Sequence, residues 1–193
     1  MKVKVISFYT PGLYANHATQ LSATCDQYGI VLEMREQGPF SCWHDAVCHK
    51  PAFIASMLAE LTHWDGLLWV DADARFRRKP DWSIFENIDI AACQFRWNRN
   101  HPFETLTGTL YFRCSEQVRA MVRAWCELTP RWAAANLDTP EQHSLQEAIA
   151  THRELRVLDL PKPWVWIEPD FNAMFATEQP IISHLQASRA RHR

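Results

Sequence analysis

The stretch "LLWVDADARF", residues 67–76, decides the fold and the site that the sequence predicts. Four apolar residues lead into two carboxylates, Asp71 and Asp73, which one alanine separates. A continuous apolar run is typical of a strand that is covered on both faces, as in an α/β sheet. Ligands of such sheets bind beyond the carboxyl ends of the strands. The stretch therefore predicts a buried strand over 67–70 with a ligand site at its carboxyl end.

The two carboxylates stand on the turn that leaves this strand, so both can reach one cation. No basic residue lies closer in the sequence than Arg75. Asp71 and Asp73 would repel each other and lose hydration if they had no partner. Their oxygen atoms suit magnesium or manganese, which keep open positions for water and phosphate oxygens. We predict a divalent-metal site here; a solvated turn without metal is the alternative that the D-x-D pattern alone leaves open.

Strand and helix patterns alternate along the rest of the chain. β-branched and aromatic residues indicate a first strand over 3–9, and apolar spacing predicts a helix over 50–61 with Pro51 at its first position. Further segments are predicted as strands over 30–34, 88–95 and 108–112 and as helices over 16–28, 115–128 and 139–150. The alternation favours a single α/β domain over residues 1–193.

Two of these helices carry start signals. Ser115 is expected as the N-cap of the helix over 115–128. Thr139 is expected as the N-cap of the next helix, with Pro140 at the first position and Gln142 where a capping box needs a glutamine. Both helices are therefore predicted with defined N-termini.

Composition excludes several classes of function. A chain of 193 residues can form one domain with a sizeable core, and its net charge of -2 gives no general attraction to nucleic acid or anionic membranes. No segment approaches the roughly 18 apolar residues of a membrane span, so we expect a cytoplasmic protein without one. Six cysteines without a C-x-x-C pair indicate reduced thiols, and the nine tryptophans and ten phenylalanines lead us to expect aromatic side chains in a cleft.

Taken in order, five segments of the chain resemble GT-A fold glycosyltransferases. These segments are "KPAFI", "LLWVDADARF", "TGTLYF", "TPEQHSL" and "SHLQASR". They are similar to the small nucleotide-diphospho-sugar transferase-like proteins of bacteria and their phages. The resemblance implies a single GT-A (Rossmann-like) domain, with a mixed, mostly parallel sheet flanked by helices. It also implies transfer of a sugar from a nucleotide-diphosphate sugar, with a UDP-sugar favoured, to an acceptor.

The resemblance implies a metal site and a residue that faces the reacting sugar. Manganese or magnesium would be held by Asp71 and Asp73, and by His184 near the end of the chain. An acid near the start of the helix over 139–150 would face the sugar; Glu141 is the candidate and Asp138 the near alternative. Each assignment has a structural alternative. His184 would then be a hydrogen-bonded histidine without a metal, and Glu141 an ordinary acid in the first turn of a helix.

The resemblance also implies residues that hold the nucleotide. The first strand and its loop would bind the base and ribose through Phe8, Tyr9, Thr10 and Tyr14. Lys50 would reach the nucleotide or a phosphate, and Ser188 and Arg189 would meet the diphosphate from a cationic end of the chain. Each assignment has an alternative. The tyrosines would pack under a loop, Lys50 would be a solvated residue before a helix, and the segment with Ser188 and Arg189 would be a frayed terminus.

Thr107, Gly108 and Thr109 are candidates for the acceptor side. Gly108 allows close backbone approach, and the threonines offer hydroxyls; a plain strand start is the alternative. The acceptor itself, whether a saccharide, a protein or a modified nucleic acid, stays open, as does retention or inversion at the sugar.

Two other functions compete with glycosyl transfer. A nucleotidyltransferase that makes nucleotide sugars would need a Gly-rich, basic loop after the first strand, and "YTPGLYANH" has no such loop. A non-catalytic nucleotide-sugar binding module is the other alternative. Two unpaired carboxylates that cost stability without a metal argue against it.

Overall fold

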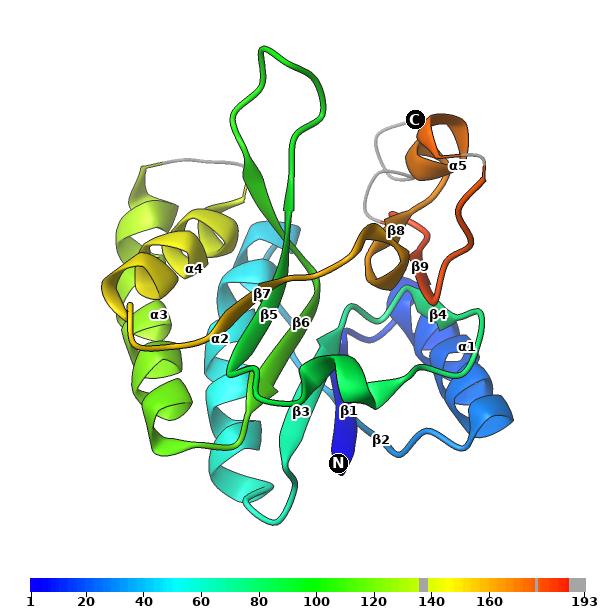
Figure 1. Cartoon of the computed structure of the whole chain (residues 1–193), viewed down its shortest axis with the longest axis horizontal. Coiled ribbons are helices and arrows are strands. Elements are labelled where there is room, and N and C mark those ends of the chain that lie inside the picture. Colours follow the sequence, from blue (N-terminus) through cyan, green and yellow to red (C-terminus); the bar gives the residue numbers. More distant parts are fainter. Residues whose placement is uncertain (136–138, 176, 188–193) are drawn as a thin grey trace.

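A six-stranded sheet forms the centre of the molecule, which is known from a computed structural model that describes residues 1–135, 139–175 and 177–187. The strand order is β2-β1-β3-β6-β5-β7 (Figure 1). The strands are β1 (Val3–Tyr9), β2 (Leu32–Glu36), β3 (Gly66–Val70), β5 (Ile90–Phe95), β6 (Glu104–Arg113) and β7 (Val157–Asp159). Only β6 runs antiparallel to its neighbours in this sheet. The predicted mixed, mostly parallel sheet is therefore confirmed.

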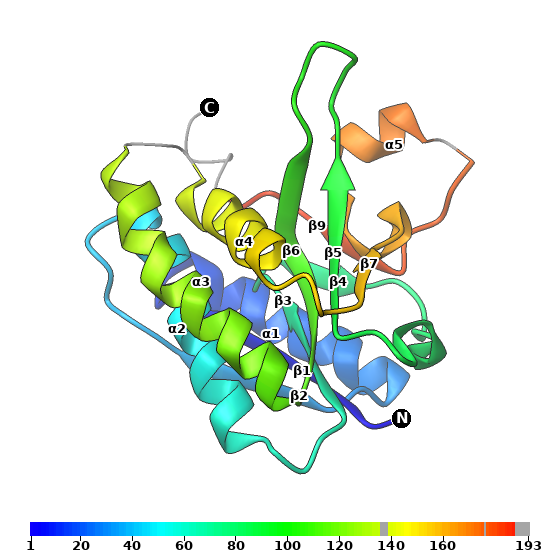
Figure 2. The ribbon, with the colours of Figure 1, turned by 60° about the vertical axis from the view of Figure 1, so that its left-hand side comes forward.

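Helices cover both faces of the sheet, as the continuous apolar strands require. The helices are α1 (Leu13–Tyr28), α2 (Trp43–Glu60), α3 (Glu116–Ala134), α4 (Pro140–Thr151) and the short α5 (Asp170–Met174). On one face, α2, α3 and α4 bury a core around Trp69 and Trp125 (Figure 2). On the other face, α1 shares a core with Trp164 and Trp166. None of the helices in the described part of the chain is long and apolar enough to cross a membrane.

A second, three-stranded sheet joins distant parts of the chain. It has the order β4-β9-β8, with β4 (Ala74–Phe76), β8 (Trp166–Ile167) and β9 (Ile182–His184). Strands β4 and β9 are antiparallel, and Ala74 is paired with His184. The small sheet lies beside α1 (Figure 1). It therefore brings His184 next to the segment that carries Asp71 and Asp73.

The structure corrects two predictions about helix starts. Helix α2 begins at Trp43, seven residues before the predicted start at residue 50, so Pro51 lies inside the helix and not at its first position. One proline removes only one helical donor, and a long packed helix tolerates that loss. Thr139 does precede α4, but its side chain makes no capping hydrogen bond, so the expected capping box is absent. Ser115 caps α3 as predicted, because its Oγ accepts a hydrogen bond from the N–H of Val118.

Strand β6 is longer than the apolar run over 108–112 that predicted it. It starts at Glu104, because residues 104–106 pair with the end of β5 beyond an irregularity at Ala92 and Cys93. The two strands and their connection form a hairpin that projects from the sheet (Figure 1). Residues 104–107, which the sequence predicted as loop, therefore belong to a strand.

Candidate active site

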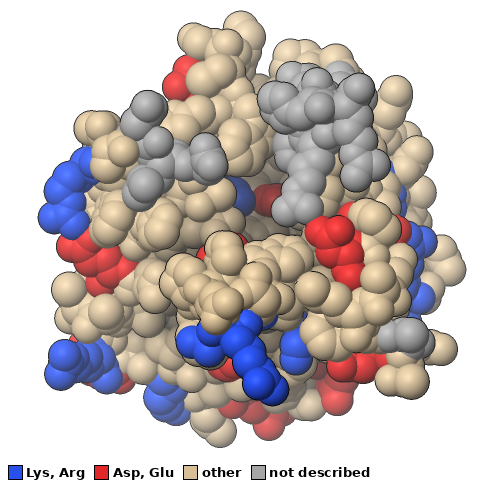
Figure 3. Space-filling model, turned by 90° about the horizontal axis from the view of Figure 1, so that it is seen from above, with Lys and Arg blue, Asp and Glu red and all other residues tan. Residues whose placement is uncertain are grey.

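A cleft of about 870 Å³ opens at the carboxyl ends of β1 and β3. Figure 3 shows this face of the molecule, which is hollowed near its centre. All but one of the described residues to which the sequence assigns a site role line this cleft, the exception being Thr109. The lining includes Phe8, Tyr9, Thr10, Tyr14, Lys50, Asp71, Asp73, Thr107, Gly108, Glu141 and His184. Ser188, Arg189 and Asp138 lie outside the described residues. The structure therefore brings the predicted residues together, although their roles stay predictions.

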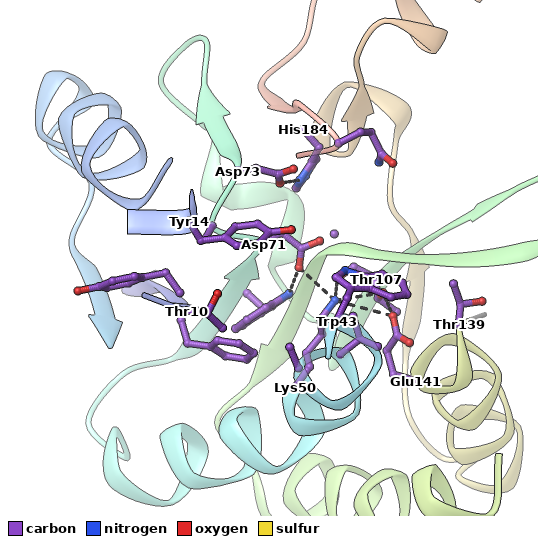
Figure 4. Close-up of a pocket in the computed structure, with 18 of the residues that line it drawn as sticks. Thr10, Tyr14, Trp43, Lys50, Asp71, Asp73, Thr107, Thr139, Glu141 and His184 are labelled. Carbon is purple, nitrogen blue, oxygen red and sulfur yellow. Dashed lines mark hydrogen bonds and ion pairs between the residues drawn. The ribbon is translucent and has the colours of Figure 1, made fainter. Parts of the chain in front are cut away.

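Asp71, Asp73 and His184 form a group that could hold a metal ion. Each offers one ligand atom, and these atoms lie within 4.8 Å of one another. The Oδ1 atom of Asp73 lies 3.8 Å from the Nδ1 atom of His184. Figure 4 shows the two side chains facing each other, with Asp71 below them. The residues come from the end of β3, the turn before β4 and the end of β9.

The ring of His184 is held so that one nitrogen faces the carboxylates. Its Nε2 atom lies 2.8 Å from the hydroxyl of Thr109, whereas its Nδ1 atom is buried and has no hydrogen-bond partner in the described structure. A Cβ atom at Gly108 would lie only 3.1 Å from the ring, so the glycine makes room for it. If Nε2 carries the proton, Nδ1 keeps its lone pair. Two carboxylates and such a nitrogen fit manganese or magnesium.

Asp73 is buried but kept charged. Its Oδ2 atom accepts a hydrogen bond of 2.8 Å from the backbone N–H of Ala187. Burial alone would raise the pKa of Asp73, but His184 and the Ala187 N–H outweigh burial and hold this pKa below its usual value. The carboxylate is therefore available as an anionic ligand near neutral pH.

Asp71 is held by a buried lysine, which the sequence alone did not show. Lys50 Nζ lies 3.0 Å from Asp71 Oδ1, and the indole N–H of Trp69 donates to the same oxygen at 3.1 Å. Lys50 also donates to the carbonyl and the hydroxyl of Thr107, each at 3.3 Å. The expectation that both carboxylates are unpaired is therefore wrong for Asp71. A contact of Lys50 with the nucleotide stays a prediction.

Glu141 lies on the other side of this lysine. Its Oε1 atom accepts a hydrogen bond of 3.0 Å from Thr107 Oγ1 and lies 4.0 Å from Lys50 Nζ. Its Oε2 atom is buried and has no hydrogen-bond partner in the described structure. Burial raises the pKa of Glu141, and the nearby Lys50 opposes that rise. Asp71, Lys50 and Glu141 thus form one row of ionisable groups at the base of the cleft, in which Lys50 and Glu141 are buried and Asp71 is partly exposed.

The predicted nucleotide residues differ in how far they reach the cleft. Phe8 is almost buried and packs against Phe53 and Trp69 with ring centroids 5.2 and 5.3 Å away. It also lines the cleft, and a contact of Phe8 with the nucleotide stays a prediction. Tyr9 and Thr10 are half-buried at the end of β1, and contacts of these residues with a base or ribose stay predictions.

The tryptophans of the cleft were not assigned from the sequence. Trp43, Trp69 and Trp97 all line it. The excess of tryptophan predicted aromatic residues in a cleft, but it did not say which ones. No local pattern marked Trp69 as a partner of Asp71, because that bond depends on the turn that follows β3.

No protein-family model and no curated protein matches the chain. Among solved structures, the chain is similar to a glycosyltransferase involved in the glycosylation of the major capsid of PBCV-1. The TM-score is 0.75 at 15% sequence identity, and the match covers 100% of this chain and 98% of that one. The likeness therefore confirms the fold that the GT-A resemblance implied: this chain has the fold of a glycosyltransferase.

Proposed function

We propose that the chain is a metal-dependent glycosyltransferase that acts as a single domain over residues 1–193. It would move a sugar from a nucleotide-diphosphate sugar, with a UDP-sugar favoured, to an acceptor. The observation that carries this proposal is the group of Asp71, Asp73 and His184 in the cleft of a glycosyltransferase fold. A cytoplasmic location stays a prediction of the sequence.

Asp71, Asp73 and His184 would hold manganese or magnesium. When bound, the cation would offset the negative charge that develops on the departing diphosphate. Lys50 and Trp69 both contact Oδ1 of Asp71, so they fix the orientation of this carboxylate and leave Oδ2 free for a ligand. Thr109 holds the ring of His184 in a similar way, because its hydroxyl lies within hydrogen-bond distance of Nε2. The three side chains that would hold the metal are therefore already oriented by their neighbours.

The two walls of the cleft would hold the two parts of the donor. Tyr9, Thr10 and Tyr14 line it at the end of β1, where open α/β sheets bind nucleotides, and we assign the base and ribose to them. Glu141 lies beyond Lys50 and also lines the cleft, and we assign it to the side that faces the transferring sugar. In the reaction, the oxygen of an acceptor hydroxyl bonds to the anomeric carbon, and the bond to the diphosphate oxygen breaks with its electron pair staying on the diphosphate. The proton of the hydroxyl passes to the departing diphosphate or to water.

A thermal-shift experiment tests the metal-bridged donor site. UDP with manganese should raise the melting temperature by about 5–10 °C at a concentration about a hundredfold above its Kd, whereas UDP in chelator should have little effect. His184→Ala should reduce the manganese-dependent rise. His63→Ala, which changes an exposed histidine outside the cleft, should not. Equal stabilisation by UDP in chelator would contradict the proposal.

Turnover separates the enzyme from its alternatives. Release of UDP from UDP-glucose, UDP-galactose or UDP-N-acetylglucosamine, with manganese and a mixture of acceptors, is expected for a glycosyltransferase. Metal-dependent binding of UDP without turnover of any UDP-sugar would favour a binding module. Formation of a UDP-sugar from UTP and a sugar phosphate would favour a nucleotidyltransferase.

A further inference from the structure

Trp43 is a large exposed side chain that the proposed function does not use. It is the first residue of α2, it is 43% exposed, and it lines the cleft. Within the described part of the chain, its indole makes no hydrogen bond and no ring contact. An unpacked tryptophan at a cleft leaves apolar surface in water, which a ligand could cover.

Polar side chains without partners accompany this tryptophan. Thr139 and Gln142, at the start of α4, line the same cleft, and neither side chain makes a hydrogen bond to any described residue. Figure 4 shows Trp43 and Thr139 on the side of Asp71 that carries Glu141, with Thr10 and Tyr14 on the opposite side. One side of the cleft therefore combines a flat apolar ring with free hydroxyl and amide groups. The nucleotide is assigned to the other side.

The charge of the cleft decides between kinds of acceptor. Its lining carries four carboxylates, on Asp71, Asp73, Glu104 and Glu141, and the lysine among the described lining residues, Lys50, is bound to Asp71. Figure 3 shows Lys and Arg side chains at the edges of this face and in a group below its centre. Single-stranded nucleic acid can stack on aromatic rings, but it also needs a positive groove along its phosphates. The described lining disfavours such an anionic acceptor.

The N-termini of α2 and α4, which lie at this side of the cleft, do not make its charge more positive. Each carries an acid in its first turn, Asp45 in α2 and Glu141 in α4. These acids offset the partial positive charge of the helix N-termini. An uncharged ligand therefore fits this side better than an anion.

From these contacts we propose that the acceptor is an uncharged saccharide whose ring stacks on Trp43. A pyranose ring has an apolar C–H face, which covers the indole, and hydroxyls at its edge, which meet Thr139 and Gln142. The inference rests on the proposed function, because it names the second substrate of the same site. It assigns the acceptor side to the start of α2 and of α4.

An NMR titration tests this assignment. Maltotriose, cellotriose, mannotriose and N,N′,N″-triacetylchitotriose are titrated into the protein with UDP and magnesium and, separately, without them. A uridine decanucleotide and a serine-rich decapeptide serve as the other two acceptor classes. At least one trisaccharide should bind, and more tightly than either of the other probes. Trp43→Ala should weaken that binding about tenfold or more, and Trp43→Phe should retain most of it.

Two controls keep the test specific. Trp64→Ala removes a tryptophan that precedes β3, at the end of the strand opposite Asp71 and outside the cleft, and it should leave saccharide binding unchanged. UDP binding should survive Trp43→Ala, so that loss of the acceptor is distinguished from loss of the donor. Melting temperatures show that each variant is folded.

Three results would overturn the inference. The first is that none of the four trisaccharides binds while UDP does. The second is that saccharide binding is unchanged in Trp43→Ala. The third is that the decanucleotide or the decapeptide binds more tightly than the trisaccharides and does so through Trp43. If UDP with magnesium does not bind at all, the proposed donor site fails instead. The titrations without UDP still show in that case whether this wall of the cleft binds saccharide through Trp43.

Discussion

Asp71 and Asp73 are one residue apart in the chain, but different parts of the molecule hold them. Asp71 directly follows β3 of the large sheet, and its side chain is 38% exposed and paired with the cation Lys50. Asp73 precedes β4 of the small sheet, and its side chain is 10% exposed and faces His184. A cation at this place would lie between the two sheets. The contrast teaches that the carboxylate of Asp71 depends on helix α2, whereas that of Asp73 depends on β9 and the residues that follow it.

The largest expected effect comes from removing either charge. Asp73→Asn and Asp71→Asn should each lower sugar transfer by about a thousandfold, because a hard cation needs the carboxylate charge. Their stabilities should differ. Asp71→Asn leaves Lys50 buried with Glu141 as its closest carboxylate at 4.0 Å, whereas Asn at position 73 can still accept from the Ala187 N–H. We therefore expect the larger fall in melting temperature for Asp71→Asn.

Manganese titration, a UDP-release assay and thermal unfolding measure these quantities on both variants. Near wild-type turnover in either variant would show that these carboxylates are not the site. A larger loss of stability in Asp73→Asn than in Asp71→Asn would contradict this order. It would mean that the contacts of Asp73 with the small sheet stabilise the fold more than the pair of Asp71 and Lys50 does.

Substitution of Lys50 should have a smaller effect, and it tests the part of the comparison that concerns Asp71. Lys50→Met removes the cation that Asp71 and Glu141 share, and loss of one partner of a buried charge pair costs about 3–5 kcal/mol of unfolding free energy. Manganese should stabilise this variant more than the wild type, because the positive charge of Lys50 beside Asp71 then no longer repels the metal ion. Lys79→Met, at an exposed lysine, should change neither quantity. Denaturant unfolding with and without manganese measures both, and an unaltered manganese response would argue against the role of Lys50.

The smallest effect concerns the pH dependence at Glu141. Burial raises its pKa in the folded protein, so its contribution to stability is present at low pH and is lost as the pH rises from the ordinary carboxyl range through the raised folded pKa. Glu141→Gln removes this titration. The variant should therefore gain stability relative to the wild type as the pH rises through that window. Urea unfolding at a series of pH values is the measurement, and parallel profiles would contradict the buried, titrating carboxyl.

Local patterns predicted the part of the fold that forms from contiguous residues. The apolar run before Asp71 became a fully buried strand, and Ser115 marked the start of α3. These signals are local because burial on both faces and helix capping each involve a few neighbouring residues. The position of the two carboxylates at a carboxyl end of the sheet followed directly from them.

Partners across the fold could not be predicted in the same way. An apolar or charged pattern shows that a residue will be buried or solvated, but not which distant residue it will meet. The bond between Lys50 and Asp71 depends on how α2 packs on the sheet, and His184 was assigned by resemblance and not by its own sequence context. Pro51 was taken for a helix start because proline favours that position, although packing also permits it inside α2.

The pairing of Ala74 with His184 also has a consequence for the order of folding. Contacts between residues so far apart in sequence close a large loop, and they form late because the entropy of closure must be overcome first. During synthesis, the first strands and helices can fold before residue 184 has left the ribosome. The group of Asp71, Asp73 and His184 is therefore completed only after β9 has paired with β4, so the ability to bind a cation would report that this pairing has formed.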